Sequence, residues 1–269
     1  MPSRKIGLIA GNRQFPFYVA DFAKAQGVEV VALALHEETS PELESHVSKT
    51  HWLHLGEIGK LLQILKEEQI KEVLMAGQVH PTRATGKLPK LDAQGMKLLA
   101  RAATRQGADL LKLFADFLAE QGYAMLDSST FLKDWLPEPG VLTKRKPSNA
   151  EQQDIAFGVE KVRGFIGSKV GQTLVVKNKA VVAVEAVEGT DATIRRAGEV
   201  AGPGCVVVKM ADPNHDMRFD IPVVGFETVQ AMVDAKATAL VVAAGKTLLL
   251  EREKLLTQAN QNDQAWVAV

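Results

Sequence analysis

Short apolar runs alternate with amphipathic stretches through the first half of this chain, and that alternation constrains the fold more than any other feature. Runs typical of buried strands cover residues 5–10, 28–35 and 72–76. Apolar residues at helical spacing cover residues 15–26 and 58–69, between those runs. Strand–helix order of this kind predicts an α/β domain with a parallel, doubly wound, Rossmann-like sheet.

This pattern continues and then stops at a proline-rich segment. Further helices are expected at 92–103 and 109–121, and a fourth strand at 123–126. The segment 136–148, LPEPGVLTKRKPS, contains three prolines and a basic run, so it cannot continue a helix or a central strand. We therefore predict an N-terminal domain at 1–135, a linker at 136–148 and a C-terminal domain at 149–269. A long surface loop inside one domain is the alternative.

The C-terminal part is expected to be a second α/β domain with a mixed sheet. A turn at 177–179 separates two short apolar runs and predicts a hairpin, which a parallel sheet alone would not contain. The remaining expected elements are helices at 149–165, 227–236 and 251–259, and strands at 205–209, 222–225, 239–243 and 247–250.

Charge and cysteine content exclude several classes of protein. The chain has 32 basic and 32 acidic residues, so it lacks the broad positive field of a dedicated nucleic-acid binder. Its one cysteine, Cys205, excludes an internal disulfide or a cysteine-rich zinc site and favours a reducing compartment. The first apolar run is too short for a signal peptide, and no run approaches about 18 apolar residues. We expect a soluble, cytoplasmic protein.

Two loops of the first domain follow predicted parallel strands, where open α/β sheets bind ligands. The stretch from Gly11 to Gln14 opens a helix, and free backbone N–H groups there favour an anion such as phosphate. It has neither a GxGxxG pattern nor a Walker lysine, so a purely structural turn is the alternative. After the third strand, Gln78 and His80 could hydrogen-bond a base or a sugar, unless His80 is an exposed loop residue.

Basic residues also cluster in the predicted linker, at Thr143-Lys144-Arg145-Lys146. A solvated charge run is the simpler interpretation. The functional alternative is an anion clamp.

Acidic residues gather in the segment 184–191, VEAVEGTD, shortly before Arg195 and Arg196. Thr190 or Asp191 could cap the helix that contains the two arginines. Capping does not explain why the acidic residues gather there, so we expect ligand contact as well.

The polar segment 209–220 joins two apolar strands and carries carboxylates together with a lysine, an arginine and a histidine. These groups suit Mg²⁺ and phosphate, because Mg²⁺ takes few protein oxygens and completes its octahedron with phosphate and water. A polar surface loop is the alternative. The chain has no HxH, HExxH or DxD arrangement and no GxSxG elbow, which disfavours a dinuclear metallophosphatase and a serine nucleophile.

Taken together, these segments resemble one known family along nearly the whole chain. The resemblance rests on the motifs GLIAGNRQFP, AGQV, GVLTKRKPS, AVEAVEGTDATIRR and VVKMADPNHDMRFDIPVVG, in that order. They are similar to the LpxI-type UDP-2,3-diacylglucosamine pyrophosphatases of bacterial lipid A biosynthesis. The resemblance implies two α/β domains with the substrate between them. It also implies Mg²⁺-dependent hydrolysis of UDP-2,3-diacylglucosamine to lipid X and UMP, with water attacking the β-phosphorus.

The resemblance also implies roles for individual residues. Asp220, in the R-x-D-x-P motif, is expected to bind Mg²⁺ or orient the attacking water, although a salt bridge with Arg218 is the structural alternative. Asp191 is expected to be catalytic and a metal ligand, and Glu188 catalytic. His215 and Asp216 inherit no role, because their loop departs from the family pattern. Expected substrate contacts are Gly11, Asn12, Gln14, Gln78, Val79, Thr143, Lys144, Gly189, Thr190, Arg195 and Lys209.

Two other functions remain as rivals at this point. A sugar-nucleotide-binding module without hydrolytic activity would use the same glycine turn and basic clusters, but the acidic residues would repel a diphosphate. A nicotinamide-dependent oxidoreductase is disfavoured by the missing GxGxxG. A substrate with two acyl chains further predicts transient contact with the cytoplasmic membrane surface. A homodimer is expected only because most soluble oligomers are dimers.

Overall fold

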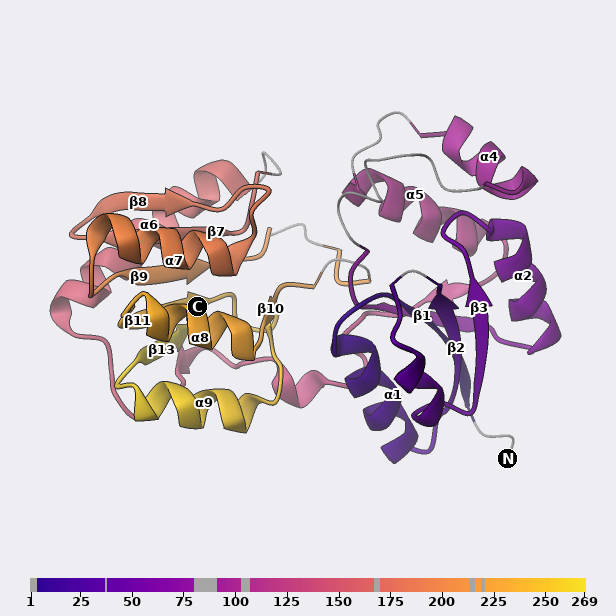
Figure 1. The fold of residues 1–269 in the computed structure, drawn as a ribbon, viewed down its shortest axis with the longest axis horizontal. Coiled ribbons are helices and arrows are strands. Elements are labelled where there is room, and N and C mark those ends of the chain that lie inside the picture. The colour runs from indigo at the N-terminus through magenta and orange to yellow at the C-terminus, as the bar shows by residue number, and fades with distance from the viewer. Residues whose placement is uncertain are drawn as a thin grey trace. The chain divides into compact units, whose positions relative to one another are not determined.

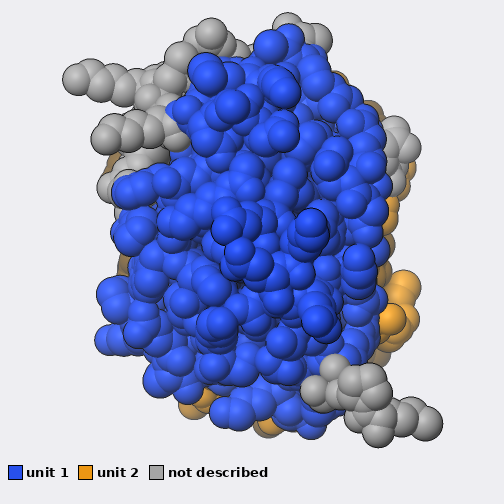
Figure 2. Space-filling model, turned by 90° about the vertical axis from the view of Figure 1, so that its right-hand side faces the viewer, with its two compact units in different colours: residues 1–132, 216–220 blue, residues 133–215, 221–269 orange. Residues whose placement is uncertain are grey.

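The computed structural model describes residues 4–36, 38–79, 91–102, 107–166, 170–212, 216–218 and 221–269. It divides into two units, which Figure 2 colours blue and orange. Unit 1 contains Met1–Leu132 and Asp216–Asp220, and unit 2 contains Lys133–His215 and Ile221–Val269. The chain therefore passes from one unit to the other three times.

A five-stranded parallel sheet forms the centre of unit 1, in the order β3-β2-β1-β4-β5 (Figure 1). Its order reverses between β1 and β4, as in doubly wound sheets. The predicted parallel sheet is confirmed, but β3 was missed. The strands are β1 (Lys5–Ala10), β2 (Glu29–Leu35), β3 (Lys49–Leu53), β4 (Glu72–Ala76) and β5 (Ala124–Met125).

Right-handed crossovers on the two sides of this reversal place α1 (Phe15–Ala25) and α2 (Ile58–Glu67) on opposite faces of the sheet. Leu61 and Leu65 of α2 pack against Leu33 of β2 in the core of unit 1. The other helical segments of unit 1 are η1 (Pro41–Ser45), α4 (Ala93–Ala100) and α5 (Gly107–Glu120).

Unit 2 contains a six-stranded sheet in the order β6-β13-β11-β9-β7-β8. β9, β11 and β13 are parallel, whereas β7 runs antiparallel to both of its neighbours and β6 antiparallel to β13, so the predicted mixed sheet is confirmed. A small parallel pair, β10 (Val223–Val224) and β12 (Leu248–Leu249), lies apart from it. The six strands are β6 (Gly140–Val141), β7 (Thr173–Lys177), β8 (Ala180–Val184), β9 (Val206–Lys209), β11 (Ala239–Val242) and β13 (Ala265–Ala268).

Alternation along β9 shows how the two faces of this sheet are covered. Val207 belongs to the core cluster under α7 (Thr190–Ala201), α8 (Phe226–Asp234) and α9 (Arg252–Gln261). Val206 and Val208 belong to the opposite cluster, under α6 (Asn149–Ile166). A short helical turn, η2 (Lys133–Trp135), precedes the sheet.

The segment 136–148, expected to be a linker, lies in unit 2. Its β6 pairs with β13 at one end of the sheet, and the amide of Leu142 donates to the Trp266 carbonyl at 2.8 Å. Among the described residues, no helix is long and apolar enough to cross a bilayer.

Candidate functional site

The two predicted ligand loops of unit 1 come together at the carboxyl ends of β1 and β4. The Gly11 amide donates to the Ala76 carbonyl and the Asn12 amide to the Gln78 carbonyl, each at 2.8 Å. A Cβ on Gly11 would lie 2.5 Å from the Gln78 carbonyl oxygen, so only glycine permits this approach. These backbones satisfy each other here, which favours the structural interpretation of the Gly11 turn.

The side chains of the other predicted contacts in these loops differ in their exposure and in their partners. The side-chain amide of Asn12 donates from Nδ2 to the Glu38 carboxylate at 2.8 Å. Gln14 and Gln78 are exposed, and Gln14 occupies the N-cap position of α1 without a side-chain cap. Val79 is partly buried and packs against the core of unit 1. His80 lies outside the described residues.

A column of rings, here the stacked side chains of His36, Trp52 and His54, lies at the same edge of this sheet and was not predicted from the sequence. His36 follows β2 and stacks on His54, which follows β3, with ring centroids 4.5 Å apart. His36 also stacks on Trp52, with ring centroids 5.4 Å apart. Both histidines are exposed, so the column offers aromatic faces beside the Gly11 loop's sheet edge. Only recognising β3 as a strand could have revealed it, because Trp52 and His54 then share one face.

In unit 2, a buried polar cluster forms where β9 ends and α7 begins. Lys209, 6% exposed, donates from Nζ to the Thr190 hydroxyl at 2.7 Å. Thr190 in turn donates to Glu185 at 3.0 Å and lies 3.2 Å from the Thr173 hydroxyl. Thr190 therefore holds the lysine ammonium in place, and the structure brings together two residues that the sequence predicted separately. Thr173 and Glu185 were not predicted.

The amino ends of α7 and α8 lie side by side at this cluster. Thr228 in the first turn of α8 donates to Asp191 in the first turn of α7 at 2.8 Å. Gly189, with φ 83°, precedes α7, and no side chain caps the helix, so the predicted capping by Thr190 or Asp191 is wrong. Two aligned helix dipoles direct partial positive charge toward the space next to Lys209, which favours an anion.

Glu188 is held as a carboxylate at the start of α7. The backbone N–H of Glu188 and the guanidinium of Arg196, 2.8 Å away, keep the pKa of this carboxyl below its ordinary value. An ionised Glu188 suits charge stabilisation or metal binding better than proton donation. Arg195 pairs instead with Asp234, the last residue of α8, at 3.2 Å, and no described contact joins it to Lys209.

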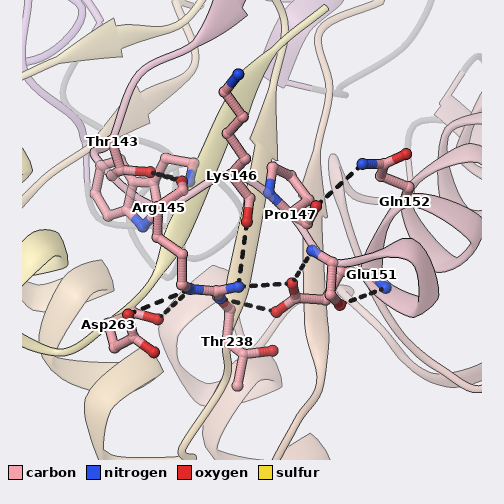
Figure 3. A network of polar contacts seen from close by, with 10 residues as sticks. Thr143, Arg145, Lys146, Pro147, Glu151, Gln152, Thr238 and Asp263 are labelled. Atoms are coloured by element: carbon pink, nitrogen blue, oxygen red, sulfur yellow. Dashed lines mark hydrogen bonds and ion pairs between the residues drawn. The ribbon is translucent and has the colours of Figure 1, made fainter.

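The basic run at 143–146 forms a structural network (Figure 3). Arg145 donates two parallel hydrogen bonds to Glu151, at 2.8 and 2.9 Å, and further bonds to the carbonyls of Thr238 and Asp263, each at 2.6 Å. The Thr143 hydroxyl accepts from the Trp266 amide at 2.8 Å. Neither the solvated-run nor the clamp interpretation anticipated this network, which ties the chain ahead of α6 to the strands that follow.

Glu151 is the charged centre of that network. Burial alone would raise the pKa of its carboxyl, but the bonds from Arg145, Thr238 and Ser148 outweigh burial and lower the pKa to about 2. Ser148 and Glu151 exchange bonds as a capping box at the start of α6.

These two groups lie at opposite edges of the unit 2 sheet. Thr238 and Asp263 precede β11 and β13, whereas Lys209 ends β9 and pairs with Val242 at the end of β11. Thr143, and the exposed Lys144, whose amide donates to Asn260, therefore lie at the amino edge. The structure does not bring them together with Lys209 and Thr190 at the carboxyl edge.

The predicted Mg²⁺ ligands are only partly described, because Asp220 lies outside the described residues. No group of three or more histidine, cysteine, aspartate or glutamate side chains suited to a metal occurs among the residues that are described. The Thr228 bond engages Oδ1 of Asp191 and leaves the other oxygen to a further partner. Mg²⁺ bound to phosphate needs only one or two protein carboxylates, so this donor chemistry fits the ion.

The fold and the site define a protein of two α/β units whose second unit brings a buried lysine together with the amino ends of two helices. Models of the LpxI N-terminal domain and the LpxI C-terminal domain match residues 5–135 and 138–266. The chain belongs to the LpxI family, and the resemblance inferred from its motifs is confirmed. The UDP-2,3-diacylglucosamine pyrophosphatase LpxI of Caulobacter vibrioides is 29% identical over 268 residues, which cover 96% of this chain and 94% of that protein.

Likeness to solved structures is slight. The biotin carboxylase domain of the Hydrogenobacter thermophilus 2-oxoglutarate carboxylase matches with a TM-score of 0.29 and 12% identity, over 67% of this chain and 36% of that one. A glycinamide-RNase-transformylase T structure from Mycobacterium tuberculosis matches with a TM-score of 0.27 and 14% identity, over 68% and 44%. The chain thus spans less than half of either, and neither match carries a functional argument.

Proposed function

We propose that the chain hydrolyses the pyrophosphate bond of UDP-2,3-diacylglucosamine, with Mg²⁺, to 2,3-diacylglucosamine 1-phosphate (lipid X) and UMP. Membership of the LpxI family over both domains carries this proposal, since the Caulobacter relative is named for that substrate. The cluster at Lys209 supports it with suitable chemistry. A buried ammonium and two helix amino ends can compensate a diphosphate for the hydration that it loses on binding.

Lys209 has the first role in this mechanism. Hydrolysis of a phosphoanhydride builds negative charge on the non-bridging oxygens and on the departing phosphate. Lys209, held by Thr190, neutralises part of that charge at a position fixed before the substrate arrives. The water oxygen bonds to the β-phosphorus, the bond from that phosphorus to the bridging oxygen breaks, and UMP leaves with the electron pair.

Carboxylates have the second role. Asp220 is proposed to accept the proton of the attacking water or to hold Mg²⁺, with Asp191 as a second metal ligand. Glu188 is proposed to assist as an ionised carboxylate. When bound, Mg²⁺ supplies further neutralisation of the phosphate oxygens.

The proposal is tested by incubating the purified protein with UDP-2,3-diacylglucosamine and Mg²⁺ and measuring the UMP that is released. Lys209→Met should lower kcat at least about a hundredfold, or about 2.7 kcal/mol of transition-state stabilisation. Lys161→Met removes an exposed lysine of α6 that pairs with neighbouring Glu160, and it serves as the control. Binding of substrate without UMP release by wild-type protein would instead establish the sugar-nucleotide-binding module.

Asp220→Ala tests the carboxylate role. The variant should fold, bind the UDP-lipid and turn over at least about a hundredfold more slowly. EDTA should abolish wild-type turnover, and added Mg²⁺ should restore it. Turnover of Asp220→Ala within a few-fold of wild type would assign Asp220 a structural role such as the salt bridge with Arg218.

Membrane contact and a homodimer complete the proposal. A substrate with two acyl chains resides in the bilayer, so the protein must reach the inner membrane surface transiently. Vesicles that carry the substrate should retain the protein more than vesicles without it. Light scattering that gives the 29.2 kDa monomer mass would exclude the dimer.

A further inference from the structure

Ser128 joins the short unit 1 portion of the polar 209–220 segment to the sheet of unit 1. The backbone N–H of Ser128 donates to the Met217 carbonyl at 2.9 Å. Its hydroxyl lies 2.9 Å from the carbonyl oxygen of Arg218 and 2.8 Å from that of Met75, near the carboxyl end of β4. One residue, 2% exposed, therefore contacts two consecutive carbonyls of a segment about 90 residues further along the chain.

The direction of Ser128 is set by its own turn. The carboxylate of Asp127 accepts from the Ser129 amide at 2.7 Å and from the Ser129 hydroxyl at 2.6 Å. The Thr130 hydroxyl donates to the Asp127 carbonyl at 2.5 Å. Turns closed by side chains in this way are stiff, so Ser128 presents its donors from a rigid support.

A single hydroxyl proton serves two carbonyls here, those of Met75 and Arg218. If that proton were lost, the carbonyl oxygen of Arg218 would lose the hydrogen bond from Ser128. The side chains of the same segment contribute too: Arg218 bonds to Asp216 at 2.6 Å and forms an ion pair with Asp116 of α5 at 3.9 Å. Ser128 thus anchors the backbone of both Met217 and Arg218 to unit 1.

We propose that Ser128 is a positioning residue for hydrolysis. It fixes the backbone at Met217 and Arg218, and Asp220 follows Arg218 by two residues of chain, which can span at most about 7 Å. The bonds of Ser128 thus hold the described backbone that lies nearest along the chain to the proposed catalytic carboxylate. This inference rests on the proposed function, because Asp220 acts only if the chain hydrolyses the substrate.

Ser128→Ala removes the hydroxyl and keeps the hydrogen bond from the Ser128 backbone N–H to the Met217 carbonyl. Ser129→Ala is its matched control. Ser129 is equally buried, at 3%, and its hydroxyl bonds to Asp127. Ser129→Ala keeps the 2.7 Å bond from the Ser129 backbone N–H to the same Asp127 oxygen, so the turn that supports Ser128 stays closed. Ser128→Ala should lower kcat about tenfold, as expected for one neutral hydrogen bond, with KM within about twofold of wild type. Ser129→Ala should leave both constants near wild type, even where both variants lose similar stability.

Hydrogen exchange separates this inference from the proposed function. Peptides that contain residues 216–218 should exchange faster in Ser128→Ala than in Ser129→Ala, whether or not the protein hydrolyses the UDP-lipid. Equal exchange in the two variants would overturn the anchoring. Faster exchange with an unchanged kcat, in protein whose wild type is active, would overturn the positioning role. An inactive wild type with faster exchange would refute the proposed function, and the positioning role with it, while leaving the anchor.

Discussion

Glu151 is the residue whose ionisation contributes most clearly to stability. Its carboxyl pKa is about 2 in the folded protein, against an ordinary value of 4.5, because bonds from Arg145, Thr238 and Ser148 outweigh the cost of burial. Between these two pH values the unfolded chain binds more protons than the folded one. Stability is therefore full above about pH 4.5 and is lost as pH falls toward 2.

Glu151→Gln should lower the free energy of unfolding at pH 7 by about 3 kcal/mol. It should also flatten the pH dependence of that free energy between about pH 4.5 and 2, measured by urea unfolding. Glu160→Gln, an exposed change on the same helix, should do neither. A pH profile of Glu151→Gln that runs parallel to wild type would contradict the ionisation argument.

At the scale of single residues, the sequence indicated which residues could belong to a site better than it indicated which residues they contact. Lys209 and Thr190 were both proposed as site residues, and the structure joins them although 19 positions separate them. The run at Arg145 was interpreted by its charge alone, because its partners Asp263 and Glu151 are 118 and 6 positions away. Distance along the chain hides such pairings from any local pattern.

Secondary structure elements were predicted where their apolar residues are regular. β1 and β4 were placed at their observed bounds, since both are buried on two faces. β3, KTHWL, is half-exposed and lies at the end of the sheet, so it shows no apolar run. β6 has only two residues, both exposed, and β13 was missed beyond the last predicted helix.

The hairpin of β7 and β8 was predicted from its turn, and the structure shows that the backbone conformation of this turn limits the stability of the hairpin. Asn178 and Lys179 have φ of 53° and 55°, and their amides donate to Asp154 of α6 at 2.9 and 2.6 Å. Left-handed backbone at two successive positions defines a type I′ turn, which favours Asn-Gly.

Lys179→Gly should therefore raise the free energy of unfolding by about 1 kcal/mol, because glycine adopts positive φ without strain. Urea unfolding measures this difference. Lys179→Ala removes the same exposed side chain and keeps the strain, so its stability should stay within a few tenths of wild type. A gain of equal size in both variants would trace the effect to the lysine charge.

On the scale of the whole molecule, each of the hydrophobic clusters described above lies within a single unit. Leu33 and Leu65 belong to the core of unit 1, and Val207 and Trp266 to a core of unit 2. A change that strains one core should thus open that unit first.

Gly11→Ala tests this separation, since its Cβ would meet the Gln78 backbone at 2.5 Å. It should destabilise unit 1 by about 2 kcal/mol, seen as faster hydrogen exchange in β1 and β4 with little change in β9 and β11. Gly164→Ala, in open space on α6, should instead stabilise by about 1 kcal/mol. Equal acceleration throughout both units would show that they unfold as one.

The three passages between units bear on how the protein is made. The ribosome completes residues 1–132 before it adds the Met217–Arg218 backbone that Ser128 binds. About 80 residues of unit 2 lie between them, which take roughly 4–16 s to synthesise at ordinary elongation rates. During that interval the nascent first unit exposes the Ser128 amide to water. Its final form is reached only after much of the second unit has been translated.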